Sequence, residues 1–260
     1  MDRSRQRTDS NAPTAPQPDG ATPPRSTELR PAEVHLWRVC TSRSATSDAA
    51  AVDALSADER VRASRLRFEA DRGRFVASHA ALRRILASYL GATPASLAFG
   101  EGPQGKPFLD APAHGQSLHF SLSHSSDLAL VAVSRGRRVG VDVERVRPLE
   151  DLDGFVARYL SPREREAFVR IPSAGRLRAF FEIWTLKEAY LKACGDGLLR
   201  ELDAFDVTVG DAPSRLLGVR DRPGDEARWA LQRVEVGKDF VAALAVEGRD
   251  WHLRRWDWSA

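Results

Sequence analysis

Two carboxylates stand two residues apart in residues 139–144, which read Val-Gly-Val-Asp-Val-Glu. Side chains alternate across a β-strand, so Gly140, Asp142 and Glu144 share one face and the three valines share the other. Carboxylates on one face repel each other unless water or a cation separates them. Oxygen ligands at this spacing suit Mg²⁺, and Gly140 leaves room beside them. A half-buried strand with a solvated acidic face is the competing interpretation.

A second candidate site lies in residues 184–192, which have the composition of a helix. Trp184, Glu188 and Lys192 are spaced i, i+4 and i+8, so they lie on one helical face. An isolated Glu–Lys pair is ordinarily a surface feature that stabilises a helix by a few tenths of a kcal/mol. Here the pair follows the apolar dipeptides Phe-Phe and Ile-Trp, so we expect this helix to be buried over a broad face.

Two weaker signals precede these. Residues 120–125, Phe-Ser-Leu-Ser-His-Ser, end an apolar strand with hydroxyl groups and an imidazole. Such groups bind phosphate or orient a substrate, although a polar hairpin turn explains them equally well. Lys106 lies between Gly105 and Pro107, which favour a turn, and the triplet alone indicates little.

Lysine is rare in this chain: four of the 39 Lys and Arg residues are lysine, at positions 106, 187, 192 and 238. The excess of arginine and alanine indicates a coding bias toward G and C and predicts a bacterial source. A lysine ammonium is compact and sits on a flexible stem, whereas a guanidinium is a planar fork. Each retained lysine is therefore a candidate for a place where arginine does not serve.

The elements that must position these residues come in two similar series. The first starts with a strand at residues 33–39. Helical periodicity then runs from Ser56 to about Leu90, with a capping box of Ser56 and Glu59 and a terminating Gly91. Extended segments follow at residues 106–109, 118–122 and 127–134.

The second series repeats this order. It begins with the acidic strand at residues 139–144 and continues with helices at residues 152–160, 163–170 and 176–194. Its last strands are expected at residues 205–209, 228–236, 240–246 and 252–257. The repeated order of elements, without a repeated sequence, predicts an α+β fold of two similar halves.

Composition excludes several classes of protein. A chain of 260 residues with 42% hydrophobic and 29% charged residues forms a globular core in one or two domains. Residues 1–31 hold six of the 15 prolines, and we predict a disordered tail there. No apolar run reaches the about 18 residues that a membrane span requires, and the first residues do not resemble a signal peptide.

Cysteine content and charge indicate the cellular compartment and the kinds of partner. Two cysteines, Cys40 and Cys194, form neither a disulfide framework nor a zinc site, so we expect reduced thiols and a cytoplasmic protein. The net charge of +3 is spread along the chain without a basic arm, and we expect no nucleic-acid partner and no membrane partner.

Taken in order, four segments resemble the successive signatures of the 4′-phosphopantetheinyl transferase superfamily. They are GKPFL at residues 105–109, FSLSHS at 120–125, GVDVE at 140–144 and FFEIWTLKEAYLKACGDGL at 180–198. The resemblance covers residues 55–198 and is to the long, surfactin-synthetase-activating type rather than to the half-length holo-acyl-carrier-protein synthase type. Each signature is weak alone, and the combined pattern is highly specific.

This resemblance implies an enzyme that moves the phosphopantetheine arm of coenzyme A (CoA) onto a serine of an acyl or peptidyl carrier protein. The other product is adenosine 3′,5′-bisphosphate. The resemblance implies a metal site for Mg²⁺, or alternatively Mn²⁺, made by Asp142, Glu144 and Glu188. Glu188 would also take the proton of the incoming serine, and Lys192 would stabilise charge on the leaving phosphate.

The CoA-binding residues that the resemblance implies are Arg62, Arg74, Lys106, Pro107, Ser123, His124, Lys187 and Lys192. Ser123 and His124 would contact the 3′-phosphate region, and Lys106 would lie near the adenine. Glu59 departs from the pattern, because family members often carry a basic residue there. Arg60 or Arg65 is the expected substitute.

The resemblance further implies two halves related by a pseudo-twofold axis, with the active site in the cleft between them. We assign residues 32–138 to the N-terminal half and residues 139–260 to the C-terminal half, and expect a monomer. Residues 158–170 are rich in arginine and would steer an acidic carrier protein, although a solvated helix explains them as well. The alternative functions are a non-enzymatic CoA- or nucleotide-binding regulator and a Mg²⁺-dependent nucleotide hydrolase.

Overall fold

The computed structural model describes residues 28–42, 48–110, 118–195 and 200–259. Most of the predicted disordered tail lies outside these residues. Its last residues do not fit that prediction, because Leu29 is buried in the core and its carbonyl oxygen accepts a hydrogen bond from Arg135. The folded domain therefore begins before residue 32.

The first sheet has the strand order β11-β1-β5-β4. Its members are β1 (Glu33–Cys40), β4 (Leu118–Ser125), β5 (Leu128–Arg135) and β11 (His252–Trp258). β4, β5 and β1 pair antiparallel, whereas β11 pairs parallel with β1. The predicted C-terminal half, residues 139–260, thus contributes its last strand to the sheet of the other half and covers an otherwise open edge.

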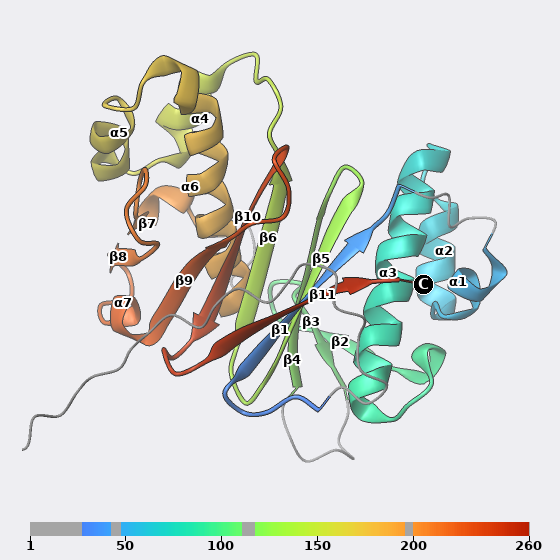
Figure 1. Cartoon of the computed structure of the whole chain (residues 1–260). Coiled ribbons are helices and arrows are strands. Elements are labelled where there is room, and N and C mark those ends of the chain that lie inside the picture. The colour runs from blue at the N-terminus through green and yellow to red at the C-terminus, as the bar shows by residue number, and fades with distance from the viewer. Residues whose placement is uncertain (1–27, 43–47, 111–117, 196–199, 260) are drawn as a thin grey trace, which may run out of the picture.

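Helices α1 (Ala49–Asp53), α2 (Ala57–Ser64) and α3 (Glu69–Leu90) lie on one side of this sheet (Figure 1). The predicted capping box at Ser56 and Glu59 is present, and Gly91 ends α3 with a left-handed conformation. The helical region breaks between α2 and α3, and α1 was not predicted. η1 (Pro94–Ser96), β2 (Phe99–Glu101) and β3 (Pro107–Leu109) lead from α3 to β4.

The second sheet has the order β6-β10-β9 and is antiparallel throughout. Its strands are β6 (Val139–Arg145), β9 (Trp229–Val234) and β10 (Phe240–Glu247). Helix α6 (Ser173–Cys194) packs against this sheet, and α4 (Leu152–Tyr159) and α5 (Pro162–Phe168) lie next to α6, beyond one end of the sheet (Figure 1). Smaller elements complete this part: η4 (Leu202–Ala204), β7 (Phe205–Val207), β8 (Leu216–Val219) and α7 (Asp225–Arg228).

The two sheets pack together through apolar side chains, and Val139, Val141 and Val143 on β6 are fully buried in this layer. The opposite face of β6 lies against α6. A Cβ atom on Gly140 would come within 2.1 Å of the carbonyl oxygen of Ala189, so only glycine allows this close approach. Each sheet carries one 22-residue helix, α3 or α6, on its outer face. The molecule thus has the predicted α+β fold with two similar parts.

Candidate active site

The acidic residues of β6 face the second half of α6, as the alternation of β6 predicted. Asp142 is 3% exposed, and its Oδ1 atom lies 2.6 Å from Nζ of Lys192 and 2.8 Å from Oγ of Ser123. Its Oδ2 atom is buried and has no hydrogen-bond partner among the described residues. Burial raises the pKa of Asp142, and the Lys192 ammonium opposes this shift.

Glu188 stands one helical turn before Lys192 on α6. Its carboxylate is mostly buried, and Oε1 has no hydrogen-bond partner in the described part of the chain. Burial raises the pKa of Glu188 to about 7, the nearby charges of Asp142 and Glu144 push it in the same direction, and Lys192 opposes them. These mutual effects show that the three carboxylates share one electrostatic environment.

Glu144 is the third carboxylate and lies near the end of β6. Its Oε2 atom accepts a hydrogen bond of 2.7 Å from Oγ of Ser125. Burial raises the pKa of Glu144, although the Ser125 hydrogen bond favours the charged form. The site therefore combines three carboxyl groups, each with a pKa raised mainly by burial, with one ammonium.

This donor set fits a divalent cation. Mg²⁺ and Mn²⁺ prefer hard oxygen ligands, and the buried, unpartnered oxygens on Asp142 and Glu188 lack the partners that buried carboxylates normally have. As they are placed in the described part of the chain, no three Asp, Glu, His or Cys side chains are grouped closely enough to hold a metal ion. The Lys192 ammonium instead balances Asp142 in this arrangement.

Ser123 is placed differently from the prediction. Its hydroxyl donates to Asp142, accepts a 2.9 Å hydrogen bond from Lys192 and also accepts from the N–H of Val143 at 3.3 Å. With 6% of its surface exposed, Ser123 has no hydrogen-bonding capacity left for a phosphate. The structure brings this serine together with Asp142 and Lys192, and it uses the hydroxyl inside the protein.

Lys187 does not join the site either, although it precedes Glu188 directly. Its Nζ atom lies 2.8 Å from Oε2 of Glu164 and donates to the carbonyl oxygens of Leu202 and Phe205 at 2.6 and 2.7 Å. An ammonium has three protons, and these contacts use all of them. Lys187 ties α6 to α5 and to the segment before β7, which is a structural role instead of the predicted contact with CoA.

Lys106 and Pro107 line a separate pocket of about 230 Å³ at the other end of β6. Nζ of Lys106 donates to the carbonyl oxygens of Val139 and Ala193 at 3.1 and 3.4 Å, so it bridges the start of β6 and the end of α6. Burial lowers the pKa of Lys106 to about 8. Arg138 lines the same pocket but pairs with Glu247 at 3.1 Å, and burial lowers the pKa of His119, so Lys106 supplies the positive charge of this pocket that no described carboxylate balances.

His124 lies at the end of β4 with part of its side chain open to solvent and part of its ring buried. Burial of its ring lowers the pKa of His124, and the charges of Lys192 and Arg74 lower it further. Arg74 pairs with Asp71 at 3.1 Å and lines a cavity of about 560 Å³ together with Arg145. These contacts place His124 and Arg74 on the carboxylate side of the molecule.

Arg62 and Glu59 lie on α2. The Arg62 guanidinium stacks over the ring of Phe75 at 5.5 Å, which orients it next to α3. Glu59 closes the capping box and also pairs with Arg83, which is 2% exposed. The acidic residue at position 59 thus has a local cause, because a basic residue there would leave the buried Arg83 without its counter-ion. No local pattern indicated a role for Arg83, because it lies in the middle of the long helix α3.

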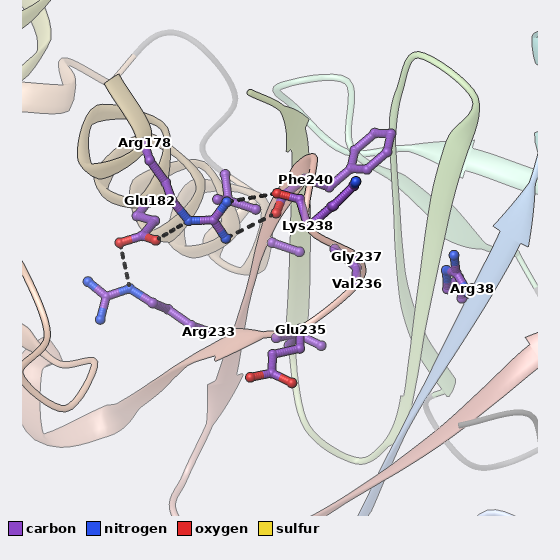
Figure 2. Close-up of a pocket in the computed structure, with 12 residues that line it drawn as sticks. Arg38, Arg178, Glu182, Arg233, Glu235, Val236, Gly237, Lys238 and Phe240 are labelled. Atoms are coloured by element: carbon purple, nitrogen blue, oxygen red, sulfur yellow. Dashed lines mark hydrogen bonds and ion pairs between the residues drawn. The ribbon is translucent and has the colours of Figure 1, made fainter. Parts of the chain in front are cut away.

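A further cavity of about 710 Å³ lies beside β9, β10 and the end of β1 (Figure 2). Arg178 spans it by donating to Glu182 and to the carbonyl oxygens of Lys238 and Phe240. Arg233 lies 3.8 Å from Glu182 on its other side. None of the predicted site residues lines this cavity, and its arginines already have partners, so the candidate active site is the carboxylate cluster on β6 and α6.

Comparison with known proteins agrees with this geometry. A model of the 4′-phosphopantetheinyl transferase superfamily matches residues 138–245, and a model of the N-terminal region of a 4′-phosphopantetheinyl transferase matches residues 42–136. Together the two matches cover most of the chain. These matches show that the chain belongs to the 4′-phosphopantetheinyl transferase superfamily and is therefore a transferase.

Individual relatives carry the same name. The chain is 38% identical over 199 residues to the 4′-phosphopantetheinyl transferase HetI of Nostoc sp., covering 76% of this chain and 81% of the relative. It is 33% identical to a phosphopantetheinyl transferase of Thraustochytrium sp., covering 73% of this chain and 69% of that relative. It is 29% identical to the 4′-phosphopantetheinyl transferase psf-1 of Bacillus pumilus, covering 73% of this chain and 77% of that relative.

Proposed function

We propose that this enzyme transfers the 4′-phosphopantetheine arm of CoA to a serine hydroxyl of an acyl or peptidyl carrier protein. Adenosine 3′,5′-bisphosphate is the other product. The observation that carries this proposal is the buried cluster of Asp142, Glu144, Glu188 and Lys192 between β6 and α6, in a chain of this superfamily. With a divalent cation held by its carboxylates, such a cluster would stabilise the charge of a pyrophosphate, which is the main requirement of phosphoryl transfer.

Asp142, Glu144 and Glu188 would hold the divalent cation, Mg²⁺ or Mn²⁺. When bound, this cation supplies positive charge that neutralises the pyrophosphate of CoA. The unpartnered oxygens of Asp142 and Glu188 support this assignment, because they need a partner in the working enzyme. The proposed transfer is direct, so no covalent intermediate forms on the protein.

Glu188 is the proposed general base. Its Oε1 atom has no hydrogen-bond partner among the described residues, so a carboxylate oxygen is available to accept a proton. It would take the proton of the carrier serine, directly or through water, as the serine oxygen attacks the β-phosphorus in line. The remaining contribution is positioning of the two substrates, which is worth several kcal/mol in reactions of this type.

Lys192 is the proposed electrostatic partner of the leaving phosphate. Its side chain is 32% exposed, so the ammonium can reach a substrate in the open side of the site while its stem stays on α6. A compact ammonium on a flexible stem fits between three carboxylates and a pyrophosphate better than a planar guanidinium. This requirement accounts for a lysine at position 192 in a chain that otherwise prefers arginine.

His124 and Arg74 are the proposed ligands of the CoA 3′-phosphate, and Arg62 supports them from α2. Lys106 and Pro107 are proposed to lie near the adenine, in the basic pocket at the other end of β6. Ser123 and Lys187 leave the proposed set of CoA contacts, because their polar groups are fully used inside the protein.

We also propose that the enzyme is a cytoplasmic monomer that binds an acidic carrier protein. Both described cysteines are free thiols, which suits a reducing compartment. None of the described helices is long and apolar enough to cross a membrane. The arginine-rich residues 158–170 on α4 and α5 carry the positive charge that would attract an acidic partner.

The test is to incubate the full chain with CoA, Mg²⁺ and an apo-carrier protein and to measure the intact mass of the carrier. A gain of one phosphopantetheine supports the proposal. CoA cleavage without carrier modification would instead favour the nucleotide hydrolase. CoA binding with neither reaction would favour the non-enzymatic regulator.

A further inference from the structure

Three serines on β4 bond to three backbone N–H groups on β6 in one regular register. Ser121, Ser123 and Ser125 accept hydrogen bonds from the N–H groups of Val141, Val143 and Arg145 at 3.1, 3.3 and 3.1 Å. β4 is the edge strand of the first sheet, and β6 is the edge strand of the second. The hydroxyls therefore take the place of the carbonyl acceptors that a neighbouring strand would supply, and they join the two sheets.

The same hydroxyls have protons to donate, and these point to the residue before each bonded N–H group. Ser123 donates to Asp142 at 2.8 Å, and Ser125 donates to Glu144 at 2.7 Å. Opposite Ser121, the position equivalent to Asp142 and Glu144 is Gly140, which has no side chain. Ser121 thus makes the same bond between the sheets as Ser125 but holds no carboxylate.

We propose that Ser125 is a positioning residue for the transfer reaction, whose hydroxyl fixes the Glu144 carboxylate in the orientation that binds the divalent cation. The oxygen of Ser125 is itself held by the Arg145 N–H, so the hydroxyl has a defined direction. A glutamate side chain at the end of a strand otherwise samples several rotamers, and ordering it on metal binding costs free energy. This proposal rests on the proposed function, because Glu144 is assigned there as a metal ligand.

The role differs from that of Ser123. Lys192 also contacts Ser123 and Asp142, so a change at Ser123 disturbs three groups at once. Within the described part of the chain, Ser125 is the hydrogen-bond partner of the Glu144 carboxylate, whose side chain is partly exposed. Removing the Ser125 hydroxyl therefore changes the orientation of one carboxylate and leaves the Lys192–Asp142 pair in place.

The experiment compares Ser125→Ala with the matched control Ser121→Ala and the conservative variant Ser125→Thr. Mn²⁺ binding to each full chain is measured by electron paramagnetic resonance in the presence of CoA, and thermal unfolding is followed in parallel. Ser125→Ala should weaken Mn²⁺ binding roughly tenfold, as expected for a hydrogen bond to a charged group. The Mn²⁺ affinities of Ser121→Ala and Ser125→Thr should stay within about twofold of the wild type. The first variant keeps Ser125, and the second keeps a hydroxyl at position 125, so both can still bond to Glu144.

A double-mutant cycle with Glu144→Ala provides the second measurement. Ser125→Ala should cause no further loss of Mn²⁺ affinity in the Glu144→Ala background, because its effect acts through that carboxylate. Equal losses in Ser121→Ala and Ser125→Ala, or an undiminished loss in the Glu144→Ala background, would overturn the proposal. Failure of the proposed function is a separate outcome, namely a wild-type enzyme that binds Mn²⁺ and CoA but does not modify the carrier.

Discussion

Lys192 on α6 and Asp142 on β6 form an ion pair with an Nζ–Oδ1 distance of 2.6 Å, and Ser123 bonds to both partners. This contact joins the helix and the strand on which the proposed ligands and base are placed. One carboxylate oxygen of Asp142 is thereby satisfied, and the other remains available. The ion pair thus positions Lys192 at the carboxylate cluster before any substrate binds.

The identity of the cation at position 192 is the first testable point. Lys192→Arg should lower kcat/KM for CoA by about 100-fold, because a planar guanidinium does not fit the site of a point-like ammonium that contacts Asp142 and Ser123. Lys238 is exposed and far from the cluster in sequence, so Lys238→Arg is the matched control and should be silent. Comparable activity of both variants would show that lysine scarcity reflects coding bias alone.

Lys187 should matter for stability rather than for CoA binding. Lys187→Met leaves Glu164 buried without its counter-ion, and this change should lower the free energy of unfolding by about 3–5 kcal/mol. Urea unfolding followed by circular dichroism measures this loss. The folded fraction should keep its KM for CoA. A raised KM with unchanged stability would restore the predicted contact between Lys187 and CoA.

His124 separates recognition of the 3′-phosphate from catalysis. His124→Ala should raise the KM for CoA about tenfold, as expected for a hydrogen bond to a charged group, and leave the KM for 3′-dephospho-CoA nearly unchanged. Steady-state kinetics with the two substrates provides the comparison. Equal effects on both substrates would contradict the proposed contact.

Acid stability should depend on Glu247 at the end of β10. Although burial opposes the shift, hydrogen bonds from Arg138 and Arg228 lower the pKa of Glu247 to about 2. The unfolded chain has the ordinary value of 4.5, so the stabilisation is complete above that pH and is lost as the pH falls from 4.5 toward 2.

The wild type should therefore exceed Glu247→Gln in free energy of unfolding by about 1–2 kcal/mol at pH 7, since the pair is partly exposed. The difference should shrink between pH 5 and about pH 2.5. Chemical denaturation across this range checks the slope. A difference that stays constant down to pH 2.5 would show that the Glu247 carboxylate is not preferentially ionised in the folded state.

Local periodicity explains what the sequence predicted well. The alternation of β6 predicted that Asp142 and Glu144 share a face, and the i, i+4 spacing placed Glu188 and Lys192 together on α6. The capping box at Ser56 was predictable for the same reason, because both of its partners lie within one helical turn. Each of these features depends on residues that are close in the sequence.

Long-range partners explain what the sequence did not predict. Lys187 and Glu188 are neighbours, but successive helical residues point in directions about 100° apart, and the partner of Lys187 lies on another helix. The parallel pairing of β11 with β1 joins opposite ends of the chain and leaves no local signature. The spacing of Ser121, Ser123 and Ser125 did carry a signal, since strand alternation puts all three on one face, but their partner strand β6 was not predictable.

The most direct test of the proposed transferase is the carrier mass measured with the wild type and with Glu188→Gln under single-turnover conditions. Glutamine keeps the size of the side chain and removes its ability to accept a proton. We predict one phosphopantetheine on the carrier with the wild type, and a loss of rate of at least about 100-fold for the variant with CoA binding largely intact. Equal rates of carrier modification by both proteins would contradict the role of Glu188, and an unmodified carrier with the wild type would contradict the function itself.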